Sequence, residues 1–198
     1  MIAVIDYSTG NLHSVGNALS RLGAEWTLTA DPAAIHAASH VILPGVGHAG
    51  EAIARLRERG LDSVIRDLRH PVLGICVGMQ ALCRHTAEGD AEGLGIFDAR
   101  VRRFEPRSEA DKVPVMGWAP IANLESKLFT GISGGEFVYF VHSYYAHLCP
   151  DTIATSRFGT EGMMYSAALK YENFYATQFH PEKSGDVGSR ILANFLNL

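Results

Sequence analysis

The chain has 198 residues, of which 47% are hydrophobic and 19% charged, and its formal net charge is −4. This composition is typical of a folded globular protein and argues against disorder. The longest basic run, Arg102-Arg103, is too short to indicate nucleic-acid binding. We expect one domain over residues 1–198. With no signal segment and no run of roughly 20 apolar residues, we expect a cytoplasmic protein.

The first half of the chain alternates short apolar strands with helices. Predicted strands cover residues 2–5, 25–29, 41–43 and 71–75, and predicted helices cover 12–22, 51–59 and 61–68, with a short one after Asp31-Pro32. Such alternation indicates an α/β fold with a mostly parallel central sheet flanked by helices.

The second half has a different pattern, in which strands follow one another with weak helical signals between them. Predicted strands cover residues 101–104, 137–141, 153–158, 164–171 and 174–179. This pattern indicates antiparallel strands beside the parallel core. A last helix carries Val187, Ile191 and Phe195 on one apolar face.

The segment 74–80 joins a predicted strand to a predicted helix through a Gly-x-Cys-x-Gly turn. Such a turn holds a nucleophile in a strained conformation, and its glycines leave the room it needs. Cys76 would sit at a helix N-terminus, which favours the reactive thiolate, and the Val77 N–H would face an oxyanion. An isolated cysteine is more often a buried structural residue, which is our interpretation of Cys83 and Cys149.

A cysteine nucleophile needs a base, and His180 at the end of the predicted strand 174–179 is the best candidate. Pro181 favours an extended His180, so Glu182 can turn back toward the imidazole and orient it. His-Pro-Glu alone is equally typical of a surface histidine beside a glutamate, and His142 is the alternative base. No cluster of His, Cys, Asp and Glu has metal-ligand spacing, and we expect no metal and no cofactor.

The loop 44–47 follows the third predicted strand, and sites in parallel sheets form beyond the carboxyl ends of strands. Gly45 and Gly47 flank Val46 and would let a peptide unit approach a substrate closely. One N–H here could be a second oxyanion donor. The alternative is an ordinary glycine-rich turn, and no Gly-Lys-Ser/Thr follows that would indicate a phosphate loop.

Together these motifs resemble the class I (triad) glutamine amidotransferases, which have a flavodoxin-like fold. Within that family the whole chain is similar to the glutaminase subunits of imidazole glycerol phosphate synthase, which serve histidine biosynthesis. The matching segments are DY-x-x-GNL-x-SV (6–15), LPGVG (43–47), GICVGMQ (74–80), MGW (116–118), YFVHSYY (139–145) and QFHPEKSG (178–185).

The resemblance implies a mechanism and a partner. Cys76 would attack the carboxamide of glutamine, and His180, oriented by Glu182, would protonate the departing ammonia and then assist hydrolysis of the thioester. The ammonia would pass to a (β/α)8-barrel cyclase subunit, in a heterodimer that makes imidazole glycerol phosphate and aminoimidazole carboxamide ribotide. We expect no nucleic acid and no membrane as partner, because the chain has no basic cluster and no apolar run of roughly 20 residues.

The resemblance also implies a role for residues outside the triad. Glutamine would be bound by Gln80 with backbone groups of Gly47, Ser143 and Tyr144. Matches to family positions at or near the cyclase interface are Asn11, Ser14, Trp118 and Lys183. Core packing is the alternative role for Trp118.

Four residues depart from the family pattern. Val115 and Ala119 stand where members often have His and Asn around Met-Gly-Trp, and His48-Ala49 stands where many have Ala-Phe. These changes concern the interface and its coupling, not the triad.

Three alternative functions stay open: a glutaminase for another synthase, a cysteine peptidase or hydrolase of similar fold, and a binding protein without activity. The glycines at 45 and 47 suggest a further hypothesis. The oxyanion hole would be unformed without a partner, so the free protein would have low activity.

Overall fold

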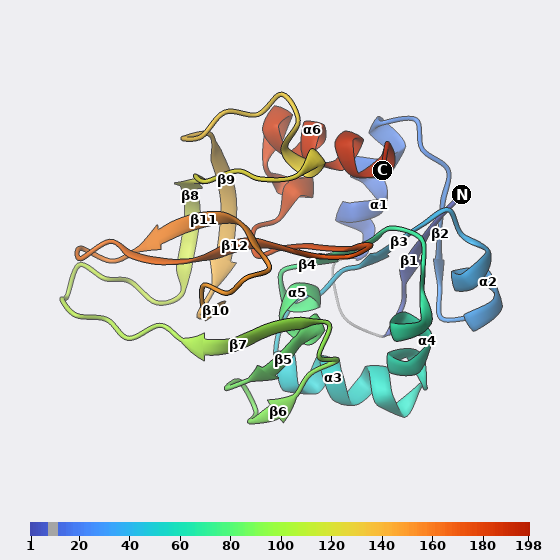
Figure 1. Cartoon of the computed structure of the whole chain (residues 1–198), viewed down its shortest axis with the longest axis horizontal. Helices are drawn as coiled ribbons and strands as arrows, with labels where there is room; N and C mark the ends of the chain where they lie inside the picture. The colour runs from blue at the N-terminus through green and yellow to red at the C-terminus, as the bar shows by residue number, and fades with distance from the viewer. Residues whose placement is uncertain (8–11) are drawn as a thin grey trace.

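The computed structural model describes residues 1–7 and 12–198, and its main feature is a large mixed sheet with helices on both faces (Figure 1). The strands are β1 (Ile2–Ile5), β2 (Trp26–Thr29), β3 (His40–Leu43), β4 (Val72–Ile75), β5 (Cys83–Thr86), β6 (Ala91–Glu92), β7 (Phe97–Arg103), β8 (Val115–Pro120), β9 (Phe137–His142), β10 (Tyr144–Ala146), β11 (Thr152–Phe158), β12 (Met163–Tyr171) and β13 (Phe174–Thr177). All of these except β8 and β9 join the large sheet, and β8 and β9 form a separate antiparallel pair.

The helices cover the parallel part of the sheet. They are α1 (Leu12–Arg21), α2 (Pro32–Ala37), α3 (Ala49–Glu58), α4 (Leu61–Asp67), α5 (Val77–Leu82) and α6 (Gly185–Leu196), with short 3-10 turns η1 (Lys127–Phe129) and η2 (Pro181–Lys183). In Figure 1, α1 and α6 lie on one side of β1, β3 and β4, and α3, α4 and α5 lie on the other. Within the described residues, no helix has the length and apolarity to cross a membrane.

The sheet order confirms the predicted fold class. Strands β2, β1, β3, β4 and β13 run parallel to their neighbours, and antiparallel pairing begins between β13 and β12. The central parallel strands bury both faces between helices, which is why β1, β4 and β13 contain only buried residues, whereas the edge strand β2 is partly exposed.

The register between strands β13 and β4 determines where the site forms. Strand β13, from the far end of the chain, lies parallel to β4 with Thr177 opposite Ile75. The Cys76 N–H donates to the Thr177 carbonyl at 2.8 Å. Residues 76 and 178 therefore follow the carboxyl ends of two adjacent strands, so segments about a hundred positions apart meet at one sheet edge.

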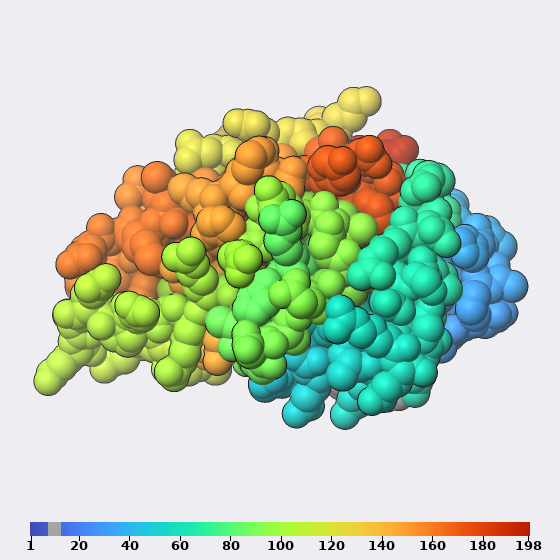
Figure 2. Space-filling view, turned by 60° about the horizontal axis from the view of Figure 1, so that its bottom comes forward, coloured from blue at the N-terminus to red at the C-terminus, as the bar shows by residue number. Residues whose placement is uncertain are grey.

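The structure differs from the predicted elements in three respects. The helix after Cys76, whose apolar face the sequence predicts to include Cys83, ends at Leu82, so Cys83 instead begins β5. Strand β13 ends at Thr177 and pairs in parallel with β4, so it is not part of a purely antiparallel layer. The sequence does not predict strands β5, β6, β8 and β10. In Figure 2, the green segment that contains β5 lies between the teal α3–α4 segment and the orange β11–β12 hairpin.

Candidate active site

The predicted nucleophile turn is present with a strained backbone. Cys76 lies between β4 and α5 with φ 53° and ψ −108°, a conformation that residues other than glycine seldom adopt. A methyl group on Gly78 would overlap the Leu43 carbonyl oxygen, and one on Gly74 would lie 2.8 Å from a methyl of Leu82. Both glycines therefore leave the space that this turn requires.

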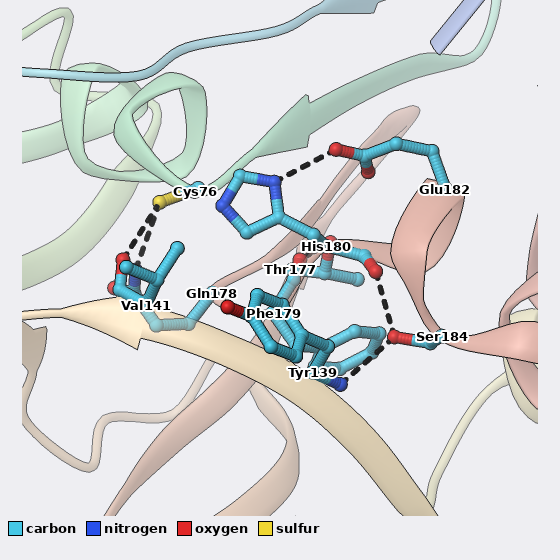
Figure 3. A network of polar contacts seen from close by, with 9 residues as sticks. All are labelled: Cys76, Tyr139, Val141, Thr177, Gln178, Phe179, His180, Glu182 and Ser184. Atoms are coloured by element: carbon cyan, nitrogen blue, oxygen red, sulfur yellow. Dashed lines mark hydrogen bonds and ion pairs between the residues drawn. The ribbon is translucent and has the colours of Figure 1, made fainter. Parts of the chain in front are cut away.

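His180 and Glu182 form a buried pair beside this turn. The imidazole Nδ1 lies 2.8 Å from Glu182 Oε1, and the two side chains are 2% and 3% exposed. Figure 3 shows the imidazole between the Cys76 sulfur and the Glu182 carboxylate. Residues 181–183 form the 3-10 turn η2 and not an extended segment, so it is this turn that brings Glu182 back to the imidazole.

The main chain of His180 is held from two directions. Its N–H donates to the Tyr139 carbonyl of β9 at 2.9 Å, and its carbonyl accepts a 2.6 Å hydrogen bond from Ser184 Oγ. Ser184 Oγ in turn accepts from the Tyr139 N–H at 2.9 Å. Because these bonds close a small ring, the imidazole is presented from a rigid backbone.

The electrostatics of the pair favour an imidazolium. Burial lowers the pKa of His180, but the Cys76 sulfur and the Glu182 carboxylate outweigh this effect and raise the pKa to about 10. Nε2, the nitrogen opposite Glu182, is buried and makes no aligned hydrogen bond. The ring therefore has one nitrogen held by a carboxylate and the other free for proton transfer.

A pocket of about 280 Å³ opens over these groups. It is lined by Cys76, His180, Gln80 and the backbone-rich segments at Val46–Gly47 and Ser143–Tyr144, together with Val77, Glu88, Pro114, Val141 and His142. The loop 44–47 packs directly on the nucleophile turn, since a methyl group on Gly45 would lie 2.6 Å from the Gly78 nitrogen. Gly47 has φ 91°, which a residue with a side chain would adopt only with strain.

Comparisons with known proteins agree with this geometry. Residues 3–198 match the family described as class-I glutamine amidotransferases. The chain belongs to this family. The amidotransferase is 52% identical to "Imidazole glycerol phosphate synthase subunit HisH" of Bacteroides thetaiotaomicron, with 100% of this chain and 99% of that protein covered. It is 42% identical to the HisH subunit of Archaeoglobus fulgidus, with 100% and 98% covered.

Solved structures show the same fold. A putative GMP synthase protein from Thermoplasma acidophilum superposes with a TM-score of 0.74 at 24% identity, covering 99% of this chain and 92% of that one. PurLQS from Thermotoga maritima gives a TM-score of 0.70 at 17% identity, covering 99% and 97%. At these identities the likeness concerns the fold of the amidotransferase alone.

Glu88 is a pocket residue that the sequence analysis missed. It lies in the turn between β5 and β6, lines the pocket and is only partly buried. Its Oε2 accepts a 2.7 Å hydrogen bond from the Ala49 N–H at the start of α3. No local motif marks this glutamate, and only the packing of the β5–β6 hairpin against α3 brings it to the pocket.

His142, the alternative base, is held as a neutral ring. Its Nδ1 donates to the Tyr144 carbonyl at 2.8 Å, and Nε2 lies 3.5 Å from the Tyr165 hydroxyl. Burial lowers the pKa of His142 to about 4. Both nitrogens are therefore occupied within the protein, whereas Nε2 of His180 is free.

The neutral His142 predicts an acid-sensitive contribution to stability. With a pKa of about 4 folded and 6.5 unfolded, the contribution is complete above pH 6.5 and is lost as the pH falls toward 4. Between pH 7.5 and pH 5 the loss should be about 2 kcal/mol. Urea unfolding of the amidotransferase and of His142→Asn at both pH values measures it. An equal loss in both proteins would contradict this assignment.

The residues expected at an interface occupy different settings. Trp118 on β8 is 55% exposed and so does not pack in the core. The Lys183 ammonium lies 5.9 Å from the centre of the Tyr139 ring. Ser14 lies partly buried on α1, and Asn11 lies outside the described residues.

Three of the four residues that depart from the family pattern have local structural roles. His48 caps α3, where its Nδ1 accepts from the Glu51 N–H at 3.3 Å. Val115 and Ala119 alternate with the exposed residues of β8 and pack against the core. All three therefore contribute to the folding of the amidotransferase.

Proposed function

We propose that this chain, as one amidotransferase domain over residues 1–198, hydrolyses glutamine and delivers ammonia to a cyclase subunit. The single observation that carries the proposal is the convergence of Cys76, the His180–Glu182 pair and Gln80 on one pocket. The strained turn, the buried carboxylate–imidazole pair and the free Nε2 are what a cysteine nucleophile with a base requires. The description of the matching family, class-I glutamine amidotransferase, supports glutamine as the substrate, and the names of the HisH relatives support a synthase partner.

The reaction proceeds in two steps. The Cys76 thiolate attacks the carboxamide carbon, and the N–H groups of Val77 and of the loop 45–47 stabilise the oxyanion. His180 then donates its proton to the departing nitrogen, the C–N bond breaks and ammonia leaves a thioester. In the second step His180 takes a proton from water, which attacks the thioester. The C–S bond then breaks, which restores the Cys76 thiolate and releases glutamate, whose new carboxyl group gives its proton to ammonia or solvent.

The pocket offers complementary groups for glutamine. Gln80 Oε1 is buried without a hydrogen-bond partner, and it can accept an N–H from the substrate. The Glu88 carboxylate can pair with the α-ammonium group, and backbone groups of Gly47, Ser143 and Tyr144 line the remaining wall. A pocket of about 280 Å³ is small for an extended peptide, which disfavours the peptidase alternative.

An apolar face next to the pocket supports docking of the cyclase. The outer sides of β8 and β9 carry three cross-strand pairs, which are Met116 with Val141, Trp118 with Tyr139 and Pro120 with Phe137. Met116, Trp118 and Phe137 are 67%, 55% and 53% exposed. Such a cluster on a monomer marks an interaction surface. Since Val141 also lines the pocket, a partner on this face would cover the site where ammonia forms.

We expect ammonia release to depend strongly on the partner. Release from glutamine is measured for the protein alone, with a (β/α)8-barrel cyclase subunit, and with that subunit plus its ribonucleotide substrate. The rate should rise by roughly ten- to a hundredfold in the complex, because docking shifts the loop 45–47 toward a formed oxyanion hole. Activity that ignores the cyclase would contradict the partner assignment, and no activity in any condition would contradict the glutaminase.

Two exposed aromatic residues make a matched comparison for docking. Trp118→Ala should abolish most of the cyclase-dependent rise, while Tyr171→Ala, which removes a 48% exposed ring from the end of β12, should leave it intact. If both substitutions changed the cyclase-dependent rise equally, the cyclase would not dock on the face formed by β8 and β9.

A further inference from the structure

A hydrogen-bonded chain of two buried amides runs from β10 to the nucleophile. Gln80 Nε2 donates to the Tyr144 carbonyl at 3.2 Å and to Gln178 Oε1 at 3.1 Å. Gln178 Nε2 in turn donates to the Cys76 sulfur at 3.7 Å, as Figure 3 shows for that last contact. Gln80 and Gln178 are 2% and 0% exposed, so water does not compete for these bonds.

The direction of the chain follows from its first member. A backbone carbonyl only accepts, so the Gln80 atom facing Tyr144 must be the amide nitrogen. That nitrogen also faces Gln178, which must then present its oxygen to Gln80 and its nitrogen to the sulfur. The same orientation leaves Gln80 Oε1 without a partner. One carbonyl thus sets the orientation of both amides.

The Cys76 sulfur needs a donor that stays in place when it ionises. As a thiol it donates weakly to the Val141 carbonyl at 3.9 Å. When its proton passes to His180 Nε2, that bond is lost and the carbonyl oxygen faces a negative sulfur. Helix α5 has only 6 residues, so its dipole stabilises charge less than a long helix would. The Gln178 N–H already points at the sulfur and becomes a charge-assisted donor.

We propose that Gln178 is a positioning residue whose N–H stabilises the Cys76 thiolate while its carbonyl holds Gln80 in the orientation that receives glutamine. The inference rests on the proposed role of Cys76 as nucleophile. Gln178 would thereby link the binding of glutamine to the ionisation of Cys76. Its side-chain oxygen accepts from the Gln80 amide, and its side-chain nitrogen faces the Cys76 sulfur.

Alkylation of Cys76 by iodoacetamide tests the inference without glutamine. The rate is followed by mass spectrometry of the peptide that contains Cys76, between pH 5 and pH 10. Gln178→Met keeps much of the volume but has no donor, and it should lower the rate at pH 7 about tenfold and move the pH profile upward. Gln178→Glu, which places a carboxylate oxygen at the sulfur, should lower the alkylation rate further. This variant provides the test if Gln178→Met does not fold.

The control removes a buried polar group away from the pocket. Thr155→Val deletes a hydroxyl that accepts from Asn123 Nδ2 at 2.9 Å, and it should lower the melting temperature without changing Cys76 alkylation. An unchanged rate and pH profile in both Gln178 variants would overturn the inference and leave the nucleophile intact. Failure of Cys76 to alkylate in the unchanged protein would instead contradict the proposed function.

Discussion

Replacing Cys76 by alanine should lower ammonia release from glutamine by at least about a thousandfold, because no other group can form the thioester. The measurement is ammonia production in the complex with the cyclase, where we expect the unchanged protein to be most active. The substitution removes only the sulfur atom from a position whose backbone is fixed by β4, α5 and the bond to Thr177. Glutamine should therefore still bind, which titration calorimetry can show.

Cys149→Ala is the matched control for this substitution. Cys149 is a free, half-buried cysteine outside the pocket, and its replacement should leave ammonia release unchanged. A protein that keeps its turnover after loss of Cys76 would refute the nucleophile. Equal losses in both variants would show that the effect comes from stability and not from chemistry.

The parts of the site that are local in sequence could be predicted from it. The turn around Cys76 is marked by an apolar strand and by two glycines at fixed offsets, and each of these signals lies within a few residues. His180 and Glu182 are two positions apart, so their contact also needs no knowledge of the fold. The burial of both faces of β4 likewise follows from its apolar run.

Other features depend on tertiary pairing and left no local signal. Strand β5 has the sequence Cys-Arg-His-Thr, which shows no clear alternation, and it forms by pairing with β7. Strand β8 contains Gly117 and ends at Pro120, both weak strand residues, and it exists because β9 pairs along its length. Glu88 reaches the pocket only after the β5–β6 hairpin packs on α3.

The amides of Gln80 and Gln178 show the same limit inside the site. The sequence places each next to a catalytic motif, but their side chains meet only because β13 adds in parallel to β4. In the antiparallel layer that the sequence predicts, β13 would not run parallel to β4, and residue 178 would not lie at the end of β4. The direction of one strand therefore decides whether the Cys76 sulfur has a side-chain donor.

Gly78→Ala should be the most destabilising of the substitutions considered, with a loss of more than about 3 kcal/mol in the free energy of unfolding. The new methyl group would overlap the Leu43 carbonyl oxygen, which is backbone of the central strand β3 and cannot rotate away. Either β3 or the start of α5 must move. Because Cys76 precedes that start by one residue, a shift of about 1 Å would also cost roughly a hundredfold in turnover in any protein that still folds.

Gly134→Ala is the same chemical change at an open position, since a methyl group there would meet nothing within 4 Å. Its unfolding free energy should differ from that of the unchanged protein by less than about 1 kcal/mol. Urea unfolding of the unchanged protein, Gly78→Ala and Gly134→Ala measures the free energy of unfolding of each. The comparison shows whether a loss comes from any added methyl group or from its position next to β3. Comparable stability of the two variants would mean that β3 and α5 can separate without cost. The close contact of Gly78 with the Leu43 carbonyl would then not be what holds Cys76 in its strained conformation.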